Sequence, residues 1–325
     1  MSTSIQWTDA VWNPVTGCTK VSAGCAHCYA ETFAHRQMGP WKGRAFSDVR
    51  CHEDRLDQPL HWRRPRRVFV NSMSDLFHET VPDAFIDWVF AVMALCPQHT
   101  FQVLTKRPQR MRDYFSNIVQ IAQGAITHER VQRLIEGMVL DEASPLTKFA
   151  RMQIRQRVVN WNAVCAWPLP NVWLGVSCED QNSLEARWPP LAELAAHGWK
   201  TFCSAEPLLG RLDLTSIEST QNMGMFFDAL RDGGGALSWV IVGGESGLQA
   251  RPCDVAWIRS IVEQCRSAGV PVFVKQLGAR PVEQRAPLAP GCGTQFAVSV
   301  RNRKGGDPDE WPEALRVRES PEIGR

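Results

Sequence analysis

The chain has 325 residues, which exceeds a typical single domain but fits one α/β barrel with insertions. With 44% hydrophobic and 22% charged residues it has ample core material, which excludes a largely disordered chain. Its formal net charge of +2 is too small to indicate a nucleic-acid binder from the overall field, so any basic face must be local.

The first distinctive segment is a cysteine loop at residues 12–31, which ends in Cys25-Ala-His-Cys28-Tyr-Ala-Glu31. Its three thiols, Cys18, Cys25 and Cys28, are spaced x6 and then x2. Gly17 and Gly24 each precede a cysteine and give the backbone freedom to bring the thiolates together. Three converging thiolates suit a soft metal.

Two metal centres are compatible with this loop. A structural zinc site normally takes four protein ligands, and His27 or Cys51 could supply the fourth. A four-iron cluster on three cysteines instead keeps one iron without a protein ligand, which a catalytic cofactor can occupy.

After the loop, six short apolar runs alternate with helical patterns, the arrangement of parallel β/α units. The predicted strands are 67–71, 100–105, 171–177, 201–205, 239–242 and 270–275. The clearest helices are 83–96, and one capped by Asp254 and stopped by Gly269. We therefore expect an α/β fold, a partial parallel barrel of about six strands, over residues 1–278.

Three segments break this rhythm. Residues 117–167 have helical composition and predict a helical insertion, and a smaller insertion is expected around 218–235. Residues 279–325 carry Pro, Gly and charge, and are expected to form a C-terminal extension.

Polar side chains follow the predicted strands repeatedly. In a parallel barrel the loops after the strands converge over one mouth, where binding and catalytic groups collect. The candidates are Ser72, Ser74, Asp75, Lys106, Ser177, Glu179, Glu206, Gly243, Gly244, Glu245 and Lys275. The lysines can receive a carboxylate or phosphate, or can form ion pairs with Glu179 or Glu206.

The cysteine loop resembles the cluster loop of radical S-adenosylmethionine enzymes, with an x6 first gap where x3 is usual. Almost the whole chain is similar to a group of phage and prophage proteins with an unassigned domain related to those enzymes. The matching stretches include 7–18, 70–78, 104–108, 171–177, 206–210 and 242–247.

This resemblance implies a [4Fe-4S] cluster on Cys18, Cys25 and Cys28, with S-adenosyl-L-methionine as second cofactor. Gly243-Gly244-Glu245 resembles the motif that binds the methionine amine, although it follows a late strand. Ser72, Ser74 and Asp75 occupy the usual early position, so both assignments stay open. Lys106, Glu206 and Lys275 are the candidates for catalysis.

The expected activity is formation of a 5′-deoxyadenosyl radical that abstracts hydrogen from a nucleotide or DNA base, in phage DNA hypermodification or a repair-like reaction. A reductase or flavodoxin-type protein would donate the electron. The N-terminus lacks a basic stretch followed by an apolar run, so we expect a cytoplasmic protein without membrane contact. The alternatives are a zinc-stabilised nucleic-acid-binding protein and a non-catalytic phage interaction protein.

Overall fold

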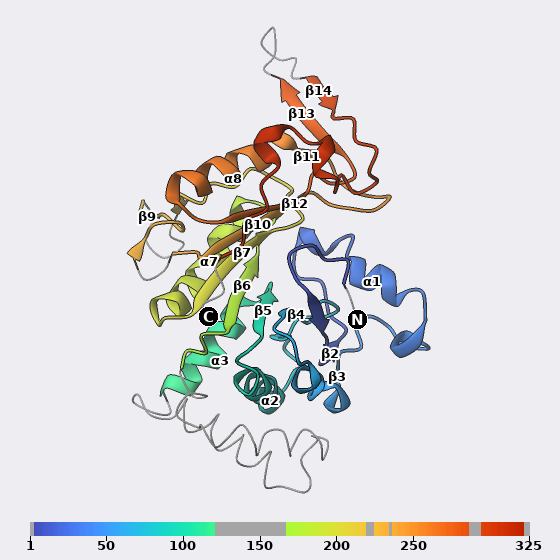
Figure 1. Cartoon of the computed structure of the whole chain (residues 1–325), viewed down its shortest axis with the longest axis vertical. Coiled ribbons are helices and arrows are strands. Elements are labelled where there is room, and N and C mark those ends of the chain that lie inside the picture. Colours follow the sequence, from blue (N-terminus) through green and yellow to red (C-terminus); the bar gives the residue numbers. More distant parts are fainter. Residues whose placement is uncertain (1–2, 121–166, 219–223, 234–235, 286–293, 322–325) are drawn as a thin grey trace, which may run out of the picture. The chain divides into compact units, whose positions relative to one another are not determined.

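The computed structural model describes residues 3–120, 167–218, 224–233, 236–285 and 294–321 (Figure 1). Its main feature is a seven-stranded parallel sheet in the order β1-β4-β5-β6-β7-β10-β12. These strands are β1 (Ala10–Trp12), β4 (Arg67–Val70), β5 (Thr100–Thr105), β6 (Val172–Ser177), β7 (Lys200–Ala205), β10 (Trp239–Gly243) and β12 (Val272–Gln276). The fold is therefore α/β with a parallel sheet consistent with a partial barrel, as the sequence predicts.

All six predicted strands are present, with ends that differ by no more than two residues. The sheet gains a seventh strand, β1, which the sequence does not predict. This strand has only three residues and pairs in parallel with β4, Ala10 against Val68 and Trp12 against Val70. So short a run has no periodicity of its own, and in the sequence its residues cannot be distinguished from the start of the cysteine loop.

The chain divides into two compact units. Unit 1 comprises residues 1–20, 29–175 and 197–200, and unit 2 comprises residues 21–28, 176–196 and 201–325. Strands β1, β4 and β5 belong to unit 1, β10 and β12 belong to unit 2, and β6 and β7 contribute residues to both.

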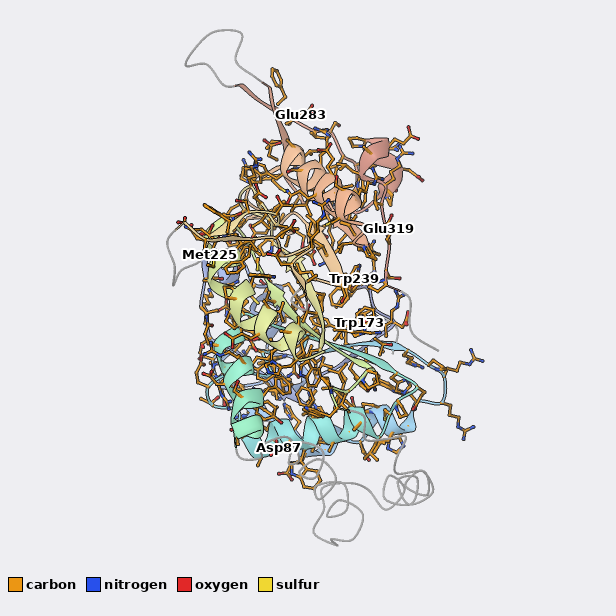
Figure 2. The ribbon with its side chains drawn as sticks, turned by 90° about the vertical axis from the view of Figure 1, so that its left-hand side faces the viewer. Asp87, Trp173, Met225, Trp239, Glu283 and Glu319 are labelled. Atoms are coloured by element: carbon orange, nitrogen blue, oxygen red, sulfur yellow. The ribbon has the colours of Figure 1, made fainter. Side chains whose placement is uncertain are left out.

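In unit 1, α2 (Asp83–Ala94) and α3 (Pro108–Gln120) accompany β4 and β5 (Figure 1). The apolar residues of the helix predicted at 83–96 are buried, and Phe90 packs edge-on against Phe115 with ring centroids 5.3 Å apart. Asp87 points from α2 and accepts a hydrogen bond from the Tyr114 hydroxyl at 2.7 Å (Figure 2). Smaller elements are β2 (Val15–Thr16), β3 (Arg50–Cys51), α1 (Tyr29–Ala34), η2 (Gly39–Trp41), η3 (Glu53–Arg55) and η4 (Gln58–His61).

In unit 2, α8 (Val255–Ala268) packs against β10 and β12. The predicted capping is confirmed, because Asp254 Oδ1 accepts from the Ala256 N–H at 2.9 Å and Gly269 closes the helix at φ 69°. The other elements are η1 (Ala23–Cys25), α7 (Gln181–Ala196), β8 (Ile217–Glu218), β9 (Phe226–Phe227), β11 (Cys253–Asp254), β13 (Pro281–Arg285), β14 (Thr294–Ala297), η7 (Pro308–Glu310) and η8 (Glu313–Leu315).

The segment after β12 is more ordered than its composition suggests. β13 and β14 form an antiparallel pair, and residues near the C-terminus run along β12, with Val274 N–H donating to Val317 O at 2.8 Å. The Trp239 indole donates to the Glu319 carbonyl at 2.9 Å (Figure 2). The insertion predicted at 117–167 begins at the end of α3 and otherwise lies outside the described residues. Within the described part, none of the helices has the length and apolar character needed to cross a bilayer.

Candidate functional site

In unit 1, the first half of the cysteine loop lies along the segment that follows β4. The Ser74 hydroxyl donates to Val15 O at 2.8 Å, and the Gly17 N–H donates to Met73 O at 3.1 Å. Ser72 exchanges hydrogen bonds with Asn13 at 3.2 Å. Ser72 and Ser74, predicted as cofactor-binding residues, thus hold the loop in place.

Gly17, directly before the first cysteine, needs the freedom that the sequence indicates. Its φ is +96°, and an added Cβ would lie 2.5 Å from the Asp48 carbonyl oxygen. No other residue type fits this position without strain.

Asp75 and the end of β5 form a polar cluster around Cys18. Asp75 Oδ1 accepts from the Thr105 hydroxyl at 2.8 Å and from the Phe77 N–H at 3.0 Å. Its Oδ2 accepts from the Lys106 N–H at 3.1 Å and from the Arg107 guanidinium at 3.2 Å. The same guanidinium lies 3.6 Å from the Cys18 sulfur. The cluster therefore places a positive charge, balanced by a buried carboxylate, against the first cysteine.

In unit 2, Glu179 follows β6 and contacts the second half of the cysteine loop at Ser22 and Gly24. Its carboxylate is buried, pairs with Arg187 at 2.8 Å and accepts from the Ser22 hydroxyl at 2.7 Å. A Cβ on Gly24 would lie 2.1 Å from Glu179 Oε1. Gly24 therefore allows the loop to approach this carboxylate closely, a role that the sequence does not reveal.

Glu245, at the end of β10, fastens the same segment of the loop. Oε1 accepts from Arg251 Nη2 at 2.6 Å, and Oε2 accepts from Arg251 N at 2.8 Å, from its Nε at 2.9 Å and from His27 Nδ1 at 3.1 Å. Arg251 also donates to the Ala23 carbonyl at 2.9 Å. Burial by itself raises the pKa of Glu245, but the Arg251 and His27 hydrogen bonds outweigh it and lower the pKa to about 2.

The remaining strand ends of unit 2 form a second ion pair. Lys275 Nζ lies 2.9 Å from Glu206 Oε1, so of the two pairings that the sequence leaves open for Lys275, the one with Glu206 is present. Glu206 Oε1 is buried, and no other described donor hydrogen-bonds to it. The Ser177 hydroxyl donates to Glu206 O at 2.8 Å.

The paired glycines after β10 have packing roles. A Cβ on Gly243 would lie 2.8 Å from Glu206 Oε1, and one on Gly244 would lie 2.3 Å from Leu277 O. Their missing side chains accommodate neighbouring protein atoms, so close approach to a ligand is not needed to explain them.

The three thiols of the loop are half-buried and form no disulfide, and the same holds for Cys51. Such thiols, with a guanidinium beside Cys18, fit a soft metal or an iron–sulfur cluster in donor chemistry. Cys18 belongs to unit 1, and Cys25 and Cys28 belong to unit 2. Among the residues that the structure describes, no three His, Cys, Asp or Glu side chains form a group able to hold a metal ion. The ligand assignment stays a prediction.

The sequence analysis does not identify three arginines that contact the candidate site residues: Arg107, Arg187 and Arg251. Arg107 stands next to the candidate Lys106, and its position after a strand was the one available signal. Arg63 and Arg64, in the basic run 63–67, are exposed.

Comparison with known proteins yields no match among curated proteins and none among solved structures. One family model, described as a protein of unknown function (DUF5131), matches residues 2–312. With nearly its whole length matched, the chain belongs to the DUF5131 family.

Proposed function

We propose that this protein is a radical S-adenosylmethionine enzyme whose [4Fe-4S] cluster is held by Cys18, Cys25 and Cys28. One observation carries the proposal: each half of the cysteine loop is fastened, within its own unit, to charged side chains that follow parallel strands. Arg107 contacts Cys18, and Glu179 and Glu245 hold residues 22–27. A parallel sheet carries its chemistry at this edge.

Half-buried thiols favour a reactive centre over a closed structural one. A structural zinc site has four protein ligands, and the candidates for the fourth are Cys51 and the Nε2 atom of His27, whose Nδ1 contacts Glu245. When bound, the cluster and S-adenosylmethionine supply the radical that removes hydrogen from the substrate. The protein's own residues must then bind the cofactor, orient the substrate and exclude water.

Two carboxylates are candidates to receive the amine of S-adenosylmethionine. A carboxylate has about four acceptor positions. Asp75 and Glu245 each accept hydrogen bonds from four protein donors, so an added ammonium group must displace one of them. Glu245 can release His27, whose side chain is 31% exposed, whereas three of the four Asp75 hydrogen bonds are buried, those from Phe77, Thr105 and Arg107. This comparison favours Glu245.

The Glu206–Lys275 pair is the proposed acid–base pair for the substrate, with Lys106 as a further cation. Glu206 Oε1 has acceptor capacity left, because a carboxylate oxygen has about two acceptor positions and Lys275 is its one described contact. We further propose a nucleotide or DNA base as substrate, in a hypermodification or repair-like reaction encoded by phage. A reductase or flavodoxin-type protein in the cytoplasm is the proposed electron donor.

Anaerobic purification tests the cluster. We expect bound iron and sulfide with visible absorbance, and cleavage of S-adenosylmethionine to 5′-deoxyadenosine under reducing conditions. Replacement of Cys18, Cys25 or Cys28 with serine should remove both properties. Cys51→Ser is the matched control, because this thiol is also half-buried and outside any disulfide, yet it lies outside the proposed ligand set. A colourless zinc protein, or a full cluster in Cys18→Ser, would overturn the assignment.

Calorimetric titration with S-adenosylmethionine tests the amine site on cluster-loaded protein. Glu245→Gln should weaken binding by about 2–5 kcal/mol, because it removes the charge that pairs with a desolvated ammonium group. Asp75→Asn should bind nearly normally. The reverse result would move the amine site to the segment after β4.

A further inference from the structure

Arg107 is the most completely bonded side chain of the candidate site, and sequence reasoning gave it no role. Its side chain is 6% exposed. Nε donates to Glu79 at 2.8 Å, one terminal nitrogen donates to Asp75 and Cys18, and the other donates to Thr19 O at 3.2 Å and Thr19 Oγ1 at 2.9 Å. All five N–H groups of the guanidinium are therefore used.

The backbone around Arg107 is fixed as firmly as its side chain. Its N–H donates to Thr105 Oγ1 at 2.8 Å, and the same hydroxyl donates to Asp75, which also faces the guanidinium. A planar fork held by partners on three sides cannot rotate without breaking several charge-assisted bonds. The Cys18–Thr19 segment is thus attached to a rigid point after β5.

The charge of Arg107 persists at every working pH. A guanidinium stays protonated in proteins, and the Asp75 and Glu79 carboxylates pair with this one. Of the two carboxylates, Asp75 is buried, whereas Glu79 is 63% exposed, so solvent screens much of the Glu79 charge. A permanent cation therefore lies against the Cys18 sulfur.

We infer that Arg107 is a positioning residue for Cys18, which fixes the sulfur for cluster binding and sets the reduction potential through its charge and N–H···S bond. This inference rests on the proposed cluster. Hydrogen bonds and positive charge beside a cluster sulfur stabilise the more negative, reduced state and raise the potential. A residue that merely supports the fold would not change this property.

Four variants of the full chain test the inference, with bound iron and reduction potential measured anaerobically. Arg107→Gln should lose several-fold in bound iron, and the cluster that remains should have a more negative potential. Arg107→Lys keeps the charge without the fork, so it should recover more of the potential than of the iron. Glu79→Gln removes a partly exposed negative charge next to Arg107, so the potential should shift in the positive direction. Arg110→Gln, in the first turn of α3 directly after Arg107 and paired with Asp83, is the control and should match the wild type.

Opposite shifts in Arg107→Gln and Glu79→Gln are the decisive result. Should Arg107→Gln fail to fold, Glu79→Gln and Arg107→Lys still decide, because a potential equal to that of the wild type in both overturns the inference. Unchanged iron and potential in a folded Arg107→Gln protein does the same. Absence of a cluster from the wild type is a separate outcome, which refutes the proposed function itself.

Discussion

Gly24→Ala should separate close packing of the cysteine loop from mere chain flexibility. The new Cβ would lie 2.1 Å from Glu179 Oε1 and 2.3 Å from its Cγ, so the two groups must separate by more than about 1 Å to reach ordinary contact. Loss of the hydrogen bond from Ser22 to the Glu179 carboxylate costs about 1–3 kcal/mol. If Glu179 also leaves Arg187, the cost rises to about 3–5 kcal/mol.

Denaturant unfolding of the full chain measures this cost, and Gly306→Ala is the matched control. The nearest atom to a Cβ on Gly306 is 3.6 Å away, and its φ does not fall in the left-handed region, so the change should stay within about 0.5 kcal/mol. In a Glu179→Ala background, Gly24→Ala should cost much less than in the wild type, because the overlapping carboxylate is gone. Equal costs in the two backgrounds would refute the proposed contact.

Three further outcomes follow from individual contacts. The pKa of Glu245 is lowered from 4.5 to about 2, so its contribution to stability is complete above about pH 4.5 and disappears as the pH falls through about 2. Glu245→Gln should therefore reduce the loss of stability between these two pH values. An unchanged loss in a pH titration of the free energy of unfolding would contradict the assignment. Asp254→Ala removes the N-cap of α8 and should lower the free energy of unfolding by about 0.5–2 kcal/mol, with Asp309→Ala, on the exposed surface, near zero. Tyr114→Phe should cost about 1–3 kcal/mol, since a buried Asp87 oxygen loses a hydrogen bond; no loss of stability would mean that water replaces the hydroxyl.

The strands and the main helices could be predicted because each depends on a local pattern. Buried parallel strands are continuous apolar runs, and α8 has its stripe, cap and stop signal within sixteen residues. β1 could not be predicted, because three residues carry no period and only pairing with β4 makes them a strand. The β13–β14 pair escaped for a related reason, since its partners are joined across residues of mixed, turn-like composition.

The candidate site shows where local patterns stop being informative. The polar residues that follow each strand can be read from the sequence, but the partners of their side chains cannot. The Ser22–Glu179 and His27–Glu245 contacts join residues 157 and 218 positions apart, so no motif or period connects them. Gly24 illustrates the consequence. Only glycine fits this position because the Glu179 carboxylate lies against it, and that contact exists only in the folded chain. The carboxylates of Glu179 and Glu245, which the sequence suggests as ligand-binding groups, therefore form hydrogen bonds that hold the cysteine loop. Any role in binding a cofactor must operate through hydrogen bonds that already hold this segment in place.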